Sequence, residues 1–226
     1  MSLKENLQAV RERMNAAMAE SGRKDEVLLV GVTKTFPASV IEDSIDCEIF
    51  DVGENKAQEF TEKYDIIGDR VNWHFIGHLQ KNKVKYVAGK VKLIHSVDSL
   101  ELAREIDRRA GQREKVQDVL LEVNVSGEES KFGLSLDAVE DLLLAVAGLE
   151  HLRVRGLMTM APNVQDESLV RGVFRGLREL RDELKGKSFG KASLDYLSMG
   201  MSQDYHLAIL EGANIIRVGS SLYGKR

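Results

Sequence analysis

The chain contains a single cysteine, Cys47, and only two prolines, Pro37 and Pro162. One cysteine cannot form an internal disulfide or a thiolate-rich zinc site, so neither constraint defines the fold. A free cysteine behaves as a small hydrophobic residue, and Cys47 is therefore expected to contribute to packing. The sequence also lacks a Pro-, Ser- or Gly-rich linker and any low-complexity tract, which favours one domain over residues 1–226.

Long apolar segments are missing as well. The N-terminal stretch MSLKENLQAVRERMNAAMAESGRKDE is charged throughout and lacks the apolar core of a signal peptide. No later run has the length that a bilayer requires. The sequence therefore predicts a cytoplasmic protein with no membrane partner.

An excess of positive charge is also missing, because the formal net charge is −4. Nucleic acid is therefore not an expected partner. The lysines of QKNKVKYVAGKVK (residues 80–92) are interpreted as a solvated helix face, with a patch for an anion or an acidic partner as the alternative. The histidines are dispersed along the chain, so no metal site is expected; they are His74, His78, His95, His151 and His206.

The sequence does contain a regular alternation of short apolar runs and amphipathic segments. The apolar runs predict strands over 27–32, 48–52, 72–76, 92–95, 118–125, 153–157, 193–197 and 214–218. Helices are expected over 3–20, 38–45, 56–64, 82–88, 99–111, 136–147, 167–184 and 205–211, the sixth with Ser135 and the last with Ser202 as N-cap. This order predicts a single (β/α)8 TIM barrel with an extra N-terminal helix, and an open doubly wound sheet is the alternative.

The first apolar run leads almost directly to a lysine, Lys34, in EVLLVGVTKTFP. In a barrel, side chains at the carboxyl ends of the strands face the active-site end. Partial burial there disfavours the ammonium form and lowers the pKa of a lysine, and a neutral amine attacks a carbonyl to form a Schiff base. The alternative is a solvent-exposed lysine at the start of a loop.

Two segments are rich in glycine and serine: YLSMGMSQDYH follows the seventh predicted strand, and IIRVGSSLYG contains the eighth and the residues that follow it. Glycine permits close backbone approach, and serine hydroxyls and backbone N–H groups suit a phosphate. The loops after strands seven and eight often bind phosphate in barrels, although two ordinary turns are the alternative. A lysine for an aldehyde and a cradle for a phosphate describe pyridoxal 5′-phosphate (PLP), but equally a Schiff-base aldolase acting on a phosphorylated sugar.

Arg217 lies on the eighth predicted strand, just before a glycine, and is expected to reach inward. Because a guanidinium only donates hydrogen bonds, it would require an unprotonated pyridine nitrogen, and such a ring is a weak electron sink. This arrangement suits restrained chemistry or the mere holding of a cofactor. The alternative is a salt bridge to Glu122.

Together these segments resemble the pyridoxal phosphate homeostasis protein family, a single-barrel relative of the alanine racemase N-terminal domain. The resemblance covers nearly the whole chain and is carried by VGVTKTFP, FDVGENKAQEF, WHFIGHLQKNK, VLLEVNVSGEESKFGL, GLMTMAP, LSMGMSQDYHLAI and IRVGSSLYG. It implies that Glu54 lies at the active-site end and that Gln80 and Asn82 lie near the cofactor. Ser220 stands where threonine is common, which keeps the hydroxyl. The cofactor site implied by the resemblance consists of Lys34, Asn55, His78, Met158, Ser198, Gly200, Ser202, Arg217, Gly219 and Ser220.

The same resemblance implies a carrier that holds PLP as a Schiff base on Lys34 and supports vitamin B6 and amino-acid balance without substantial catalysis. Racemases of the related type use a second base from a partner subunit and a second β domain, and neither is expected here, where only Ser221 to Arg226 follow the eighth strand. A monomer is therefore predicted, with PLP-dependent apo-enzymes as partners. The alternative is a PLP-dependent amino-acid racemase or Schiff-base lyase.

Overall fold

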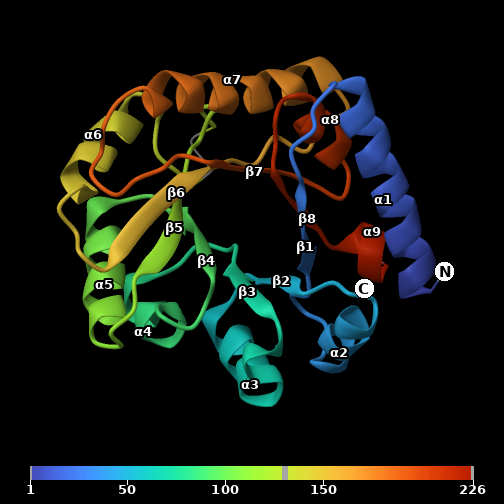
Figure 1. The fold of residues 1–226 in the computed structure, drawn as a ribbon, viewed down its shortest axis with the longest axis horizontal. Coiled ribbons are helices and arrows are strands. Elements are labelled where there is room, and N and C mark those ends of the chain that lie inside the picture. Colours follow the sequence, from blue (N-terminus) through green and yellow to red (C-terminus); the bar gives the residue numbers. More distant parts are fainter. Residues whose placement is uncertain (1, 129–131, 225–226) are drawn as a thin grey trace.

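The computed structural model describes residues 2–128 and 132–224, and within them eight parallel strands close into a barrel (Figure 1). Each strand pairs with the next, and the last pairs with the first, with Gly31 opposite Val218. The predicted TIM barrel is confirmed, and the open doubly wound sheet is wrong. The strands are β1 (Leu28–Val32), β2 (Asp51–Glu54), β3 (Asn72–Phe75), β4 (Leu93–Val97), β5 (Gln117–Glu122), β6 (Leu152–Met158), β7 (Tyr196–Met201) and β8 (Ile215–Val218).

Helices surround the barrel, as Figure 1 shows. The predicted helix over 82–88 is shorter than expected, because a 3₁₀ turn, η2 (Lys81–Lys83), precedes a single α-helical turn. A second 3₁₀ turn, η1 (Gly68–Arg70), leads into β3. The α-helices are α1 (Leu3–Glu20), α2 (Ser39–Asp46), α3 (Ala57–Ile67), α4 (Val84–Val87), α5 (Leu100–Gly111), α6 (Ala138–Val146), α7 (Glu167–Lys185), α8 (Tyr205–Leu210) and α9 (Ser220–Tyr223).

The extra helix α1 has the predicted bounds and packs against α8 and α9 (Figure 1). Ser2 and Glu5 form a capping box at its start, in which each side chain accepts from the other residue's backbone N–H. The Asn6 side chain donates to the Leu222 carbonyl at 2.7 Å and ties α1 to α9. The helix buries an apolar stripe formed by Leu7, Val10, Met14 and Ala17.

Two strands begin three residues later than the sequence predicts. The stretch before β2 contains Glu48 in a left-handed conformation (φ 60°), and Ile49 packs outward in the core between barrel and helices. An apolar run alone does not distinguish such a turn from a strand. The strand β7 also begins late, at Tyr196, and it continues to Met201. Ser198 and Gly200 therefore lie within the strand and not in a loop.

Neither expected serine cap is present. The helix α6 begins with Asp137 and α8 with Asp204 at the N-cap position, and neither residue makes a side-chain capping hydrogen bond. The Ser202 hydroxyl instead accepts from backbone N–H groups at the end of β8, where it joins two loops. Cys47, at the end of α2, is half-buried and packs against the core as predicted.

The interior of the barrel is divided between apolar and polar side chains. Because side chains alternate along a strand, every second residue points inward. One small apolar cluster comprises Val30, Leu93, Leu120, Met158 and Ile215, separate from the larger core that packs the strands against the helices. Polar groups from β3, β4, β7 and β8 occupy other inward positions.

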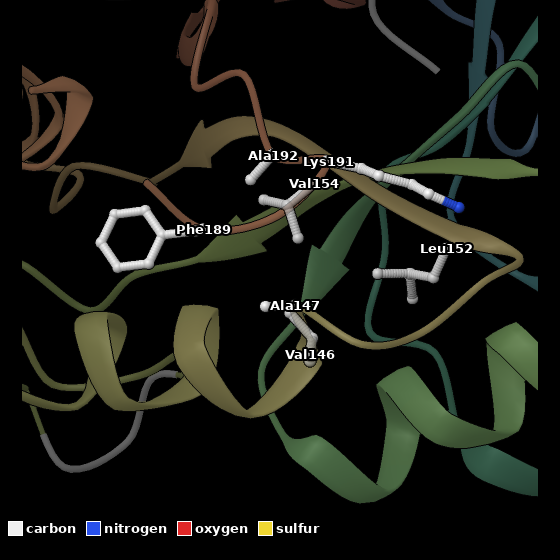
Figure 2. A pocket seen from close by; sticks show the side chains of 7 residues that line it. All are labelled: Val146, Ala147, Leu152, Val154, Phe189, Lys191 and Ala192. Atoms are coloured by element: carbon white, nitrogen blue, oxygen red, sulfur yellow. The ribbon is translucent and has the colours of Figure 1, made fainter. Parts of the chain in front are cut away.

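Outside the barrel, a small pocket lies between α6 and the segment leading to β7 (Figure 2). It borders the first residues of β6, whereas the candidate site lies at the carboxyl ends of the strands. Its lining is mostly apolar and offers no group of polar atoms for a ligand: Val146, Ala147, Leu152, Val154, Phe189, Lys191 and Ala192. In the described part of the chain, no helix is long and apolar enough to span a membrane.

Candidate active site

Lys34 lies two residues beyond β1, at the carboxyl end of the barrel, and is half-buried in a tight turn. Thr35 adopts a left-handed conformation (φ 67°), and its N–H donates to the Glu59 carboxylate on α3. The Phe36 N–H donates back to the Thr33 carbonyl at 3.1 Å. These bonds define the path of the turn, so the position of Lys34 depends on α3 as well as on β1.

A buried ion network supports this turn from the outer side of the barrel. The Lys63 ammonium donates to Glu54 Oε1 at 2.7 Å, to Glu59 Oε1 at 2.9 Å and to the Thr33 carbonyl at 2.7 Å. The Thr33 hydroxyl also donates to Glu54 Oε1, at 2.6 Å. Burial raises the pKa of Glu54, and the bonds from Lys63 and Thr33 oppose that shift. The network fixes the residue immediately before Lys34.

Glu54 ends β2 and so lies at the active-site end of the barrel, as the resemblance implies. Its side chain is fully buried and bonded to Lys63 and Thr33. The sequence interpretation missed Lys63. The available signal was the spacing of Glu59 and Lys63, four residues apart on a predicted helix, which brings the two charges together.

The adjacent Asn55 carries an unsatisfied polar atom. Its Oδ1 is buried without a hydrogen-bond partner among the residues that the structure describes. A Cβ built on Gly77 would lie 2.3 Å from the Asn55 carbonyl oxygen, so the loops after β2 and β3 touch through backbone atoms. A buried side-chain oxygen without a partner is available to a ligand that donates a hydrogen bond.

Arg217 points into the barrel from β8 and is 3% exposed. Its Nη1 donates to the carbonyl (3.0 Å) and hydroxyl (2.5 Å) of Ser198, and its Nη2 donates to the Thr159 carbonyl (3.0 Å). Among the described residues Arg217 makes these hydrogen bonds and no direct ion pair with Glu122, although the two charges interact at longer range. Burial lowers the pKa of Arg217 to about 10, opposed by the charges of Glu122 and Asp204, so it remains a cation at neutral pH.

The two segments predicted to hold a phosphate meet around Ser202. Its hydroxyl accepts from the N–H groups of Gly219 (3.1 Å) and Ser221 (3.3 Å), and its carbonyl accepts from the Ser221 hydroxyl. Ser220 is exposed at the start of α9 beside them. Backbone N–H groups that converge on one oxygen form a site that also suits an anion.

The other two residues of these segments have different positions. Ser198 is fully buried inside the barrel, where its hydroxyl contacts His95 and Arg217 and is not presented to a phosphate. Gly200 lies at the end of β7 with φ 94°, and a Cβ there would come within 2.8 Å of the Tyr205 Cα. Gly200 therefore shapes the backbone before Ser202.

His78 and Met158 lie at different depths. The His78 ring stacks on Phe132, with 4.0 Å between ring centroids, and its Nδ1 is 3.7 Å from Asp98 Oδ2. Met158 is buried in the apolar cluster inside the barrel. Gln80 and Asn82, expected near the cofactor, line a hollow with Lys81 and with Glu105 of α5.

Two histidines that are distant in the sequence are in contact inside the barrel. His74 Nδ1 and His95 Nε2 are 2.8 Å apart, and both side chains are buried. The sequence interpretation treated them as dispersed, and the missed signal was that each occupies an inward position on its strand. Among residues 2–128 and 132–224, no cluster of His, Cys, Asp and Glu has the arrangement of a metal site.

Glu122, at the end of β5, makes stability depend on pH. Burial and the charge of Asp98 raise its pKa to about 7, opposed by Arg217. A raised carboxyl pKa means that the folded state binds the proton more tightly, so stability is full below pH 4.5 and falls as the pH rises through about 7. The loss is about 3 kcal/mol. We expect Glu122→Gln to remove most of this slope in urea unfolding measured from pH 5 to pH 8. An unchanged slope would contradict the assignment to Glu122.

The closed barrel of eight parallel strands places the chain in the class of (β/α)8 barrel proteins, and one family description matches it. The description "Alanine racemase, N-terminal domain" matches residues 2–226, and the chain belongs to this family. A "Pyridoxal phosphate homeostasis protein" from Aquifex aeolicus (strain VF5) is 46% identical over 100% of this chain and 99% of its own length. The resemblance seen in the sequence is therefore confirmed.

Two solved structures extend the comparison. PipY of Synechococcus elongatus PCC7942, solved with PLP bound, is 31% identical, covers 99% of this chain and 100% of its own, and superposes with a TM-score of 0.85. Alanine racemase from Corynebacterium glutamicum is 15% identical, with a TM-score of 0.66 over 97% of this chain and 62% of its own. The second likeness concerns the fold alone.

Proposed function

We propose that this chain binds PLP through a Schiff base with Lys34 and acts in PLP homeostasis. The supporting observation is the closure of β8 onto β1, which sets the Lys34 turn beside the Ser202–Gly219 loops. A Cβ built on Gly219 would contact Val32, two residues before Lys34, at 3.4 Å. A relative with 31% identity was solved with PLP bound.

The residues present fit the cofactor on two observations. The buried Oδ1 of Asn55 has no partner among the described residues, and the N–H groups of Gly219 and Ser221 converge on a single oxygen, the Ser202 hydroxyl. PLP supplies an aldehyde that reacts reversibly with amines. Lys34 would hold the aldehyde, Arg217 would face the ring nitrogen, and His78 and Met158 would border the ring. Ser202, Gly219 and Ser220 would hold the phosphate.

The proposed role is that of a carrier without substantial catalysis. A guanidinium at the ring nitrogen only donates, which leaves the ring unprotonated and limits its capacity to stabilise a carbanion. The curated relative from Aquifex aeolicus, matched along nearly its whole length, is named a homeostasis protein. Delivery to apo-enzymes, the monomeric state and the cytoplasmic location stay predictions.

Titration with PLP tests the binding. We expect wild-type protein to develop the visible absorbance of a Schiff base, saturating at one PLP per chain, and Lys34→Ala to develop none. Lys56→Ala, an exposed lysine near the site, is the matched control and is expected to behave as wild type. Wild-type protein that gives no saturable band would contradict the proposal.

The second candidate is a PLP-dependent racemase or lyase, and one observation favours it. Glu122 is a buried carboxyl whose pKa is raised to about 7, the range that suits a general acid or base. Sustained racemisation of chiral amino acids by purified protein, lost in both Lys34→Ala and Glu122→Gln, would replace the carrier role by catalysis. The carrier proposal predicts no turnover above the rate of free PLP.

A further inference from the structure

A continuous line of side-chain hydrogen bonds crosses the interior of the barrel. Asp51 Oδ1 lies 2.9 Å from His74 Nε2, and His74 Nδ1 lies 2.8 Å from His95 Nε2. His95 Nδ1 lies 2.9 Å from Ser198 Oγ, which accepts from Arg217 Nη1 at 2.5 Å. The line joins a carboxylate at the start of β2 to a guanidinium on β8. It passes through three fully or nearly fully buried side chains.

Each end of this line has a fixed role as hydrogen-bond donor or acceptor. Arg217 only donates hydrogen bonds, and an ionised carboxylate only accepts them. Burial opposes ionisation of Asp51, but the hydrogen bond from His74 and the hydrogen bond and charge of Lys92 lower its pKa. Asp51 is therefore a carboxylate at neutral pH.

The histidines in the middle are neutral. Burial lowers the pKa of His74, partly opposed by Asp51, and the charge of Lys92 lowers it further. Burial also holds the pKa of His95 well below its usual value, with added lowering from the charge of Arg217. A neutral imidazole carries one donor and one acceptor nitrogen. If one ring nitrogen must accept a hydrogen bond, the other must therefore donate one.

Only one direction satisfies every contact in the line. The Ser198 hydroxyl donates to His95 Nδ1, His95 Nε2–H donates to His74 Nδ1, and His74 Nε2–H donates to Asp51. In the reverse arrangement an unprotonated His74 Nε2 would face the Asp51 carboxylate at 2.9 Å, and two acceptors would repel. Both rings therefore carry their proton on Nε2.

We propose that Asp51, His74, His95 and Ser198 are positioning residues that hold the Arg217 guanidinium in place through this one-way hydrogen-bond chain. The Ser198 hydroxyl must donate toward His95, so its free lone pairs face Arg217 Nη1. The hydrogen bonds to Ser198 and Thr159 occupy three of the five N–H groups of Arg217. The orientation of the remaining donors is thereby fixed. That these donors face a pyridine nitrogen rests on the proposed function. The hydrogen-bond chain from Asp51 to Arg217 does not depend on it.

Nitrogen NMR of histidine tests the chain in ligand-free protein. With ¹⁵N-labelled histidine, we expect both His74 and His95 to show the neutral Nε2–H form at pH 7 to 8. We expect Ser198→Ala to shift the ring nitrogens of His95, because Nδ1 loses its donor. Ser96→Ala is the matched control, since this buried serine on the same strand as His95 donates to the Gly77 carbonyl outside the chain. An imidazolium, an Nδ1–H form in either ring, or a Ser198→Ala spectrum identical to wild type would overturn the proposal.

The rate of PLP release tests the positioning of Arg217. Asp51→Asn keeps an acceptor oxygen beside His74 but removes the charge at the end of the chain. We expect Asp51→Asn and Ser198→Ala to release PLP about tenfold faster than wild type and Ser96→Ala to match wild type. Release at the wild-type rate from both chain variants would overturn the positioning role. Wild-type protein that binds no PLP would contradict the proposed function. The NMR result would still decide whether the hydrogen-bond chain from Asp51 to Arg217 is present.

Discussion

Replacing Lys63 by methionine is expected to cause the largest loss of stability among single changes near the site. Lys63 is 5% exposed and is the cation bonded to the fully buried Glu54. Its removal leaves a carboxylate in the interior without a counter-charge, which costs about 3–5 kcal/mol of unfolding free energy. Chemical denaturation followed by circular dichroism measures this loss.

The same variant is expected to disturb Lys34. The Thr33 carbonyl and Glu59 both lose the Lys63 ammonium, so the turn that carries Lys34 loses its support. The double variant Lys63→Met, Glu54→Gln removes both charges and is expected to recover most of the stability. It is not expected to recover PLP binding, since the donor to Thr33 stays absent. A lone Lys63→Met with wild-type stability would contradict the account of the network.

Lys187→Met is the matched control for this prediction. Lys187 forms a 2.7 Å ion pair with Glu140, but both side chains are about 40% exposed. Water replaces the lost partner at such a surface pair. We expect the unfolding midpoint to stay at the wild-type value, which separates the effect of a buried cation from the general loss of a lysine.

Alanine at position 200 is expected to have the second largest effect. Gly200 has φ 94°, and a Cβ there would lie 2.6 Å from the Ala208 Cβ and 2.8 Å from the Tyr205 Cα. Both the left-handed conformation and the contact with backbone resist a side chain. We expect Gly200→Ala to lower the free energy of unfolding by about 2–4 kcal/mol.

Gly219→Ala is the matched comparison for Gly200→Ala. Its φ of −114° suits any residue, and the added Cβ would meet Val32 at an ordinary 3.4 Å. We therefore expect stability within about 1 kcal/mol of wild type. If a phosphate approaches the Gly219 backbone as proposed, affinity for PLP falls although stability does not. Equal losses of stability in the two alanine variants would contradict this distinction.

The sequence was sufficient to predict the barrel and the place of Lys34. Both depend on short-range patterns, namely the alternation of apolar runs and amphipathic segments and a lysine that directly follows the first run. The bounds of α1 were predicted correctly for the same reason, since its apolar stripe is a local pattern. The bounds of β2 were not, because Ile49 before it is apolar yet packs outside the sheet.

The polar connections of the site could not be predicted in this way. His74, His95, Ser198 and Arg217 come from four strands spread over more than half the chain, and only closure of the barrel brings them together. Ser198 illustrates the consequence. Its sequence context suggests a phosphate loop, but the strand continues past it and turns its hydroxyl inward.

Borohydride reduction followed by peptide mass mapping tests the central proposal most directly. Purified protein is incubated with PLP, reduced and digested, and the position of the phosphopyridoxyl group is read from the peptide masses. The account predicts that the group is found on Lys34, with one modification per chain. Modification spread over surface lysines, or found elsewhere with Lys34 unmodified, would contradict it.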